Sequence, residues 1–543
     1  MTGFDRLPGE LSDYRLNQYF LEHTWKMVSD HTYTGKLYGP SMFTPYPNTL
    51  AFSDNLFGAA PIYWLLRFFL MPDIASMGWL MVLSLLNFLS MLFILRKENV
   101  QPALAGLGGF LFAFPLSRVA QYAHAQLFPQ FCTPLCLWLV WRFALKPSKL
   151  GWLLILITLY WQILCGIYLG WFLLLVTLIF SIVTISVLPE SRQKVGTFLY
   201  RCWSFVALSL GVWAFLLYKF LQPYLEMKRI MGGNSYDVVA ELLLKPISLF
   251  MVPAANSLWS PILGSLHHLL GVSDPNAPIL WIHYNFPGSV LMILTGMIVY
   301  KFLRKKTAVF GNQKRLVLAF TITGLIVAFC ATDFGHGVSL WRLIYQIIPG
   351  ASAIRAPIRI FLTLLPCLII AGIIFLNEYL KTSRLSQSAT KYLIACIIVL
   401  AIFEQRTIPY TYDAASVRAK DAELGQVTKQ YCQAAYISPF NQRNEELSFV
   451  SGIYAQVDAM WAGINANVPV VNGYSGYSPP GFLRTWQDKQ PIIDWLSANK
   501  SKPIDRLCFI SRYPPKTEPG IQVLETHQST HYIVQVIRYP QRP

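Results

Sequence analysis

The sequence predicts an α-helical polytopic membrane protein of about 10–11 spans with a C-terminal α/β or α+β domain outside the cytoplasm. The 543-residue chain is 54% hydrophobic and 15% aromatic, and its mean hydropathy is +0.42. Long apolar runs recur from residue 75 to residue 409. After residue 409 the chain becomes polar, and short strand-like runs replace the long apolar ones. The sequence therefore divides into an outer head with an acidic motif (1–74), a transmembrane helical domain (75–409) and a C-terminal domain (410–543).

Each apolar run is about as long as a helix that crosses a bilayer, or slightly shorter. We expect spans at 75–95, 101–117, 127–145, 151–165, 167–187, 198–221, 286–303, 316–331, 357–376 and 392–409. The uncharged run 151–188 is too long for one span, so we expect a tight hairpin between Trp161 and Gly166. The run 56–71 contains Pro61 and Arg67, which favours a helix lying at the membrane interface over a short span.

Basic residues are unevenly distributed among the loops between these spans. One set of alternating loops contains fifteen Lys and Arg residues, and the opposite short loops contain four. Basic loops remain in the cytoplasm, so the head, the loop 222–285 and the tail are predicted to lie outside. The net charge of +17 has the same explanation, and no basic stripe with interleaved aromatic residues indicates a nucleic-acid partner.

An outer head needs a segment that carries it across the membrane. No signal peptide or apolar span precedes residue 75 in the sequence as given. Either the head crosses unaided, which is unusual, or a first transmembrane span lies upstream of Met1, and we favour the upstream span.

The tail contains runs typical of strands, at 447–455, 468–474, 506–511 and 531–539. Its two cysteines, Cys432 and Cys508, are able to pair in an oxidising compartment. The other seven cysteines lie in apolar segments and resemble small core residues. The aromatic, glycine-rich loop Asn472–Phe482 is either a lid that faces a carbohydrate or lipid, or an ordinary exposed turn.

Polar residues with chemical potential concentrate on the predicted outer face. The segment GELSDYRLNQYFLEH contains Asp13, Arg15, Glu22 and His23, and a second polar segment, FTPYPNTLAFSDN, ends near Asp54. Carboxylates at a water–lipid boundary are able to act as acid or base on a substrate from either phase.

Two further outer loops supply basic and amide side chains. The first contains Arg118, His124 and Gln126. The second contains Arg355 and Arg359, which flank Pro357 and are four residues apart, so both can face one anion at the mouth of a span. Arginines that only extend toward the interface are the alternative reading.

Four segments resemble bacterial multispan proteins of the GT-C glycosyltransferase superfamily. They are GELSDYRLNQYFLEH and FTPYPNTLAFSDN in the head, the HAQL that begins at His124, and GYSGYSP in the tail. Relatives usually have GD-x-x-D where this chain has Gly9-Glu10-Leu11-Ser12-Asp13, so the acidic residue is kept and Ser12 replaces a common glycine. The resemblance implies a GT-C-like bundle in the bacterial inner membrane and a polyprenyl-phosphate-linked sugar as donor.

Under this resemblance each candidate residue has an expected role. Asp13 is the catalytic base, and Asp54 is a second carboxylate that orients the acceptor or holds a divalent cation, Mg²⁺ or Mn²⁺, together with Asp13. Arg355, Arg359 and Arg118 stabilise the lipid phosphate. The other substrate-binding candidates are Arg15, Glu22, His23, His124 and Gln126.

Two other classes of protein remain open. A transporter or flippase is expected to carry polar or charged residues inside its spans. The predicted spans contain few, Gln162 being one. A non-catalytic protein of cell-envelope assembly is the third reading.

Overall fold

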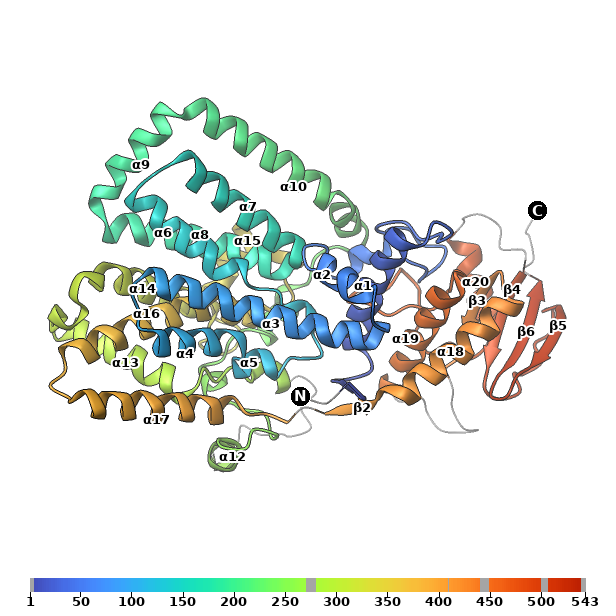
Figure 1. Cartoon of the computed structure of the whole chain (residues 1–543). Coiled ribbons are helices and arrows are strands. Elements are labelled where there is room, and N and C mark those ends of the chain that lie inside the picture. The colour runs from blue at the N-terminus through green and yellow to red at the C-terminus, as the bar shows by residue number, and fades with distance from the viewer. Residues whose placement is uncertain (1–3, 270–279, 409, 440–448, 500–505, 539–543) are drawn as a thin grey trace.

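The computed structural model describes residues 4–269, 280–408, 410–439, 449–499 and 506–538. A large helical bundle occupies one end of the molecule and a smaller sheet-containing tail the other, with the N-terminal helices between them (Figure 1). The chain is a helical polytopic membrane protein with a C-terminal mixed sheet, as the sequence predicts.

Each predicted span overlaps a helix of the bundle. By length and composition, seven helices of the described part can cross a membrane, and α7 and α13 are shorter apolar helices. The bundle helices are α3 (Pro72–Lys97), α4 (Pro102–Ala113), α6 (Cys132–Leu145), α7 (Lys149–Cys165), α8 (Ile167–Val187), α10 (Trp203–Met231), α13 (Ser289–Leu303), α14 (Lys314–Ala331), α16 (Phe361–Thr382) and α17 (Gln387–Gln405). Shorter connecting helices are α5 (Leu116–Val119), α9 (Pro189–Arg201), α11 (Tyr236–Glu241), α12 (Ser260–Leu269) and α15 (Trp341–Ile347).

Helix α16 forms the centre of the bundle and α10 lies at its edge. The most apolar stretch of α16 is 94% buried because the helix is apolar on every side and packs against α4, α13 and α14. In α10 only 6% of the corresponding stretch is buried. Its apolar side chains therefore face outward, as those of a lipid-facing helix do.

The predicted division of the run 151–188 into two helices is confirmed, but residues Trp161–Cys165 still belong to the first helix and the turn is at Gly166. Helix α7 ends at Cys165, and α8 begins at Ile167 directly after Gly166. The two helices pack so closely that a Cβ atom on Gly170 would lie 2.5 Å from the Cα atom of Ile163. A larger residue at this position would separate the helices.

The N-terminal segment joins the bundle to the tail. Helix α1 (Asp13–Ser29) is buried along most of its length, and α2 (Ala60–Arg67) packs beside it. Strand β1 (Arg6–Pro8) pairs antiparallel with β2 (Thr411–Asp413), at the start of the tail. Side chains of α1 share a hydrophobic core with the tail, so the first residue of α1 is held between two parts of the molecule.

The tail contains a four-stranded mixed sheet with strand order β3-β4-β6-β5. Strands β3 and β4 are parallel, and the other pairs are antiparallel. The strands are β3 (Ala434–Ile437), β4 (Arg506–Ser511), β5 (Val523–Gln528) and β6 (Ile533–Arg538), and the helices are α18 (Ala414–Tyr431), α19 (Phe449–Ala466) and α20 (Lys489–Ala498). Strand β4 confirms the prediction at 506–511, and β6 lies within the predicted run 531–539, whose last residue is outside the described residues.

Two of the predicted tail strands are wrong. The described part of the run 447–455 belongs to helix α19. Its apolar residues continue at helical spacing through Ile453, Val457, Met460, Trp461 and Ile464, a period that a nine-residue window does not reveal. The run 468–474 contributes only an isolated parallel bridge between Ala435 and Val470.

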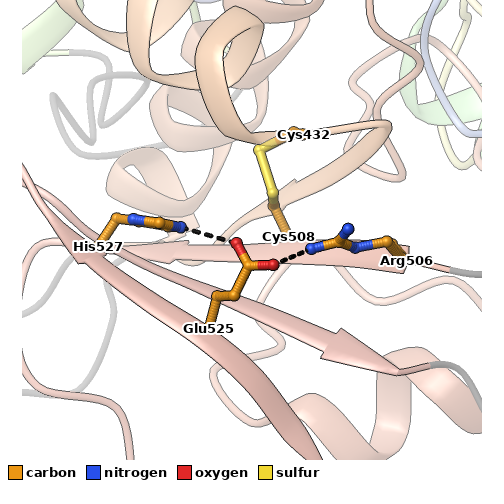
Figure 2. Close-up of a disulfide and its surroundings, with 5 residues drawn as sticks. All are labelled: Cys432, Arg506, Cys508, Glu525 and His527. Atoms are coloured by element: carbon orange, nitrogen blue, oxygen red, sulfur yellow. Dashed lines mark hydrogen bonds and ion pairs between the residues drawn. A yellow bond between two sulfur atoms is a disulfide. The ribbon is translucent and has the colours of Figure 1, made fainter.

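Cys432 and Cys508 form a disulfide that links the end of α18 to β4 (Figure 2). Beside it, the carboxylate of Glu525 pairs with Arg506 and, at 3.0 Å, with Nε2 of His527. The predicted pairing of the two tail cysteines is confirmed.

Candidate active site

The candidate site is centred on Asp13, the first residue of α1. Its Oδ1 accepts a hydrogen bond of 2.8 Å from the hydroxyl of Tyr474, in the glycine-rich tail loop. Its Oδ2 lies 3.2 Å from Nε2 of His124, in the loop before α6. The Asp13 side chain is 26% exposed, so it remains accessible between these two contacts. Three segments far apart in the sequence thus meet at one carboxylate.

His124 is held between Asp13 and an aromatic ring. Its imidazole stacks on the indole of Trp281, in the 3₁₀ turn Leu280–His283, with ring centres 4.7 Å apart. The pKa of His124 is lowered to about 4, mainly by burial and also by the charges of Arg359 and Arg355, while the charge of Asp13 opposes this shift. The ring is therefore neutral near pH 7. Its Nδ1 atom is buried and has no hydrogen-bond partner among the described residues.

The two arginines that flank Pro357 lie near this pair, but they are not equivalent. Arg359 is buried, with its guanidinium carbon 5.7 Å from the centre of the Tyr168 ring and its Nε unpartnered within the described chain. Arg355 is exposed. The Tyr168 hydroxyl accepts hydrogen bonds from the backbone N–H groups of Arg355 and Ala356, at 2.6 and 3.2 Å. Tyr168 therefore fixes the loop that carries both arginines.

Arg484, just after the glycine-rich tail loop, adds a third guanidinium to this region. The guanidinium carbon of Arg484 lies 5.1 Å from the centre of the Tyr474 ring, and its Nη2 donates to the Ser475 carbonyl and to Ser478 Oγ. Burial lowers the pKa of Arg484, while Tyr474 and Asp13 raise it. Burial and the adjacent Asp13 both raise the pKa of Tyr474, so its hydroxyl remains a donor to Asp13.

Asp54 has a different environment from Asp13. Its Oδ1 accepts hydrogen bonds of 2.7 and 3.3 Å from the backbone N–H groups of Ile167 and Tyr168, at the start of α8. Burial raises the pKa of Asp54, and these two bonds and Arg359 oppose the rise. Asp54 thus anchors the first turn of the helix that carries Tyr168. These contacts indicate a structural role for Asp54, which holds in place the helix that carries Tyr168.

A divalent cation does not fit the side chains at this site. Mg²⁺ and Mn²⁺ prefer several carboxylate or carbonyl oxygens around one point. Asp54 is directed at helix N–H groups, and Asp13 at Tyr474 and His124. Within the described ranges, no three Asp, Glu, His or Cys side chains gather as a metal site requires.

The other candidates in α1 are engaged in ion pairs or hydrogen bonds inside the protein. Arg15, 1% exposed, pairs with Asp421 at 2.7 Å and Asp458 at 2.5 Å, which fastens α1 to α18 and α19. Glu22 pairs with Arg67 at 2.9 Å and accepts from the Tyr63 hydroxyl. His23 is fully buried, with Nδ1 2.9 Å from the Tyr33 hydroxyl. Because these contacts are internal, we leave Arg15, Glu22 and His23 out of the proposed site.

The remaining candidates, Arg118 and Gln126, differ from each other. Arg118 is fully buried and donates to the carbonyls of Phe112 and Ala113, the last residues of α4, and to Gln130. These carbonyls carry the negative end of the helix dipole, so Arg118 stabilises the end of α4. Gln126 follows His124 closely, and its Oε1 is buried without a partner in the described chain. Its predicted role as a hydrogen-bonding group for substrate stays a prediction.

Sequence reasoning did not identify Tyr474, Arg484 or Trp281 as members of the site. The loop that contains Tyr474 stood out by its aromatic and glycine content, but nothing in the sequence connects it to Asp13, 461 residues away. Trp281 lies in the loop 222–285, in which the sequence predicted no candidate residue. Only the fold brings these side chains to the head.

No protein-family model matches the sequence, and no curated protein matches it significantly. Among solved structures, the chain is similar to the crystal structure of ArnT from Cupriavidus metallidurans in the apo state. The similarity covers 98% of this chain and 94% of the ArnT chain, with a TM-score of 0.32 and 10% sequence identity. At this TM-score and identity the match carries no argument, and the function proposed below rests on the site residues.

Proposed function

We propose that the protein is a membrane glycosyltransferase that moves a sugar from a polyprenyl-phosphate carrier to an acceptor hydroxyl. The observation that supports it is an accessible carboxylate, Asp13, beside a neutral His124 and a buried Arg359. Arg359 Nε is a buried donor without a partner in the described chain, and His124 Nδ1 is a buried acceptor in the same condition. Buried polar atoms are nearly always paired, so such a set is typical of a site that binds a polar substrate.

The reaction needs two kinds of group, and the site contains both. In the transfer, the bond between the anomeric carbon and the phosphate oxygen breaks, and a bond to the acceptor oxygen forms. The electron pair of the broken bond leaves with the polyprenyl phosphate, whose charge Arg359 and Arg355 stabilise. The acceptor loses its proton, and this step depends on the Asp13 carboxylate. A single displacement of this kind inverts the anomeric centre.

The proposal places the site on the outer face of the membrane, and reporter fusions test this placement. Fusions after Glu98, Ser148, Arg192, Lys305 and Arg384 are expected to report the cytoplasm, because the basic loops contain these residues. A fusion after Asp421 is expected to report the outside. A cytoplasmic signal at Asp421 would reverse the orientation and move the site to the inner face.

The Tyr474 hydroxyl provides a graded test of the site. Tyr474→Phe removes the hydrogen bond of 2.8 Å to Asp13 and keeps the ring that packs against Arg484. Hydrogen bonds to charged groups contribute about 1.5–3 kcal/mol, so transfer is expected to slow roughly 10- to 100-fold. The measurement is the transfer rate at equal protein level in membranes, with the exposed Tyr513→Phe as matched control. A rate equal to that of the control would remove Tyr474 from the site.

A transporter of the same lipid is the alternative reading, and the fate of one bond separates the two. In vesicles that contain radiolabelled polyprenyl-phosphate sugar and an acceptor, a glycosyltransferase breaks the sugar–phosphate bond, and the label leaves the polyprenyl carrier. A transporter moves the lipid across the bilayer with this bond intact. Gln162, the polar residue noted inside a predicted span, already has partners in Thr133 and the Pro129 carbonyl, which favours the enzyme.

A further inference from the structure

The Asp13–His124 pair has a defined polarity. An ionised carboxylate only accepts hydrogen bonds, so the ring nitrogen that faces Asp13, Nε2 at 3.2 Å, carries the proton. In a neutral imidazole the other nitrogen then has the lone pair. That nitrogen is His124 Nδ1, which is buried and without a partner in the described part of the chain. The basic atom of the Asp13–His124 pair that has no partner in the described chain is therefore His124 Nδ1.

The surroundings of His124 fix the direction of this lone pair. The ring is held flat against Trp281 by stacking at 4.7 Å, and Asp13 holds its other edge. Asp13 itself is held on its second oxygen by Tyr474 at 2.8 Å. The same arrangement recurs on unrelated folds. A carboxylate orients an imidazole, and the far nitrogen of the ring then takes a proton from a hydroxyl.

We propose that His124 Nδ1 removes the proton from the acceptor hydroxyl and that Asp13 acts as the positioning residue. The inference rests on the proposed glycosyl transfer. The acceptor proton moves to Nδ1 as the acceptor oxygen bonds to the anomeric carbon, and the phosphate leaves with its electron pair. The resulting imidazolium is stabilised by Asp13 through Nε2–H, and it returns its proton to water after the product leaves. The free N–H of Arg359 meets the departing phosphate while Nδ1 meets the hydroxyl.

His124→Gln separates a base from a positioning group. The glutamine amide is able to donate to Asp13 as Nε2–H does, but it has no basic nitrogen. If Nδ1 is the base, His124→Gln is expected to lower transfer about 10²–10⁴-fold. The matched control is His531→Gln, since the His531 side chain is 60% exposed on the tail and lies in a different part of the molecule. Equal membrane levels of both variants show that folding is kept.

His124→Gly supplies the second measurement. Removing the ring leaves space beside Trp281 for a free imidazole, which is expected to restore transfer in proportion to its concentration. At pH 8, 4-methylimidazole should restore more activity than the similarly sized but less basic 4-chloroimidazole, because general-base catalysis follows basicity. A residue with only a structural role would show no dependence on the basicity of the added compound.

The assay uses the full chain in membranes with a radiolabelled polyprenyl-phosphate sugar, and each outcome has one meaning. Loss in His124→Gln together with basicity-dependent rescue of His124→Gly supports the inference. Transfer by His124→Gln within about threefold of the parent would overturn it, since that variant has no base at this position, and the proposed function would stand with Asp13 as the base. Loss without rescue by either imidazole would also overturn it. If the parent itself releases no sugar, the proposed function fails and the inference with it.

Discussion

Replacing Asp13 with asparagine is expected to lower the rate of sugar transfer by about 10²–10⁴-fold. The asparagine keeps the size of the side chain and still accepts a hydrogen bond from the Tyr474 hydroxyl. It lacks the charge that proton removal from the acceptor requires, whether Asp13 acts directly or through His124. Stability should change by about 1 kcal/mol or less, because Asp13 is partly exposed and the asparagine keeps the hydrogen bond from Tyr474.

The measurement is the initial rate of label release from a polyprenyl-phosphate sugar in membranes with matched protein levels. Asp494→Asn, an exposed residue on α20, makes the same chemical change away from the site and should transfer at the parent rate. An Asp13→Asn protein as fast as this control would show that the chemistry does not depend on Asp13.

Replacing both Arg355 and Arg359 with glutamine is expected to weaken binding of the carrier lipid. A hydrogen bond to a charged group contributes about 1.5–3 kcal/mol, so losing even one corresponds to a roughly 10- to 100-fold higher Kd. Arg359 should account for most of the loss, because it is buried and its Nε has no partner among the described residues, whereas Arg355 is exposed to water.

Binding of a fluorescent polyprenyl-phosphate analogue to the detergent-solubilised protein measures this effect. The matched control replaces Arg192 and Arg304, two exposed arginines of the loops predicted to face the cytoplasm. An unchanged Kd in Arg355→Gln/Arg359→Gln would leave these residues with the interfacial role that is the alternative reading of the sequence.

The helices of the bundle were predictable because their signal is local. A run of apolar residues long enough to cross a bilayer forms a helix in lipid, because the helix satisfies the backbone hydrogen bonds within the segment. The hairpin at Gly166 was predictable in the same way, from the length of an uncharged run. The start of helix α19 was predicted as a strand. Its residues from Phe449 to Ala455 include several that also favour strands.

The site was only partly predictable because its residues come from distant segments. Asp13 and His124 were assigned to one face by the alternation of loops, and the structure places them 3.2 Å apart. Arg15 was a candidate because charges are rare in this chain, but its partners Asp421 and Asp458 lie more than 400 residues away. Tyr474, from the same distant part of the chain, was not identified for the same reason.

The most direct test of the proposed function follows the sugar–phosphate bond itself. The purified full-length protein is reconstituted in liposomes that contain a radiolabelled polyprenyl-phosphate sugar, and an acceptor lipid extract is added. The account predicts that the parent protein transfers the label from carrier to acceptor and that Asp13→Asn reduces this transfer at least about 100-fold. Label that remains on the carrier with the parent protein, for every polyprenyl-phosphate sugar supplied, would contradict it.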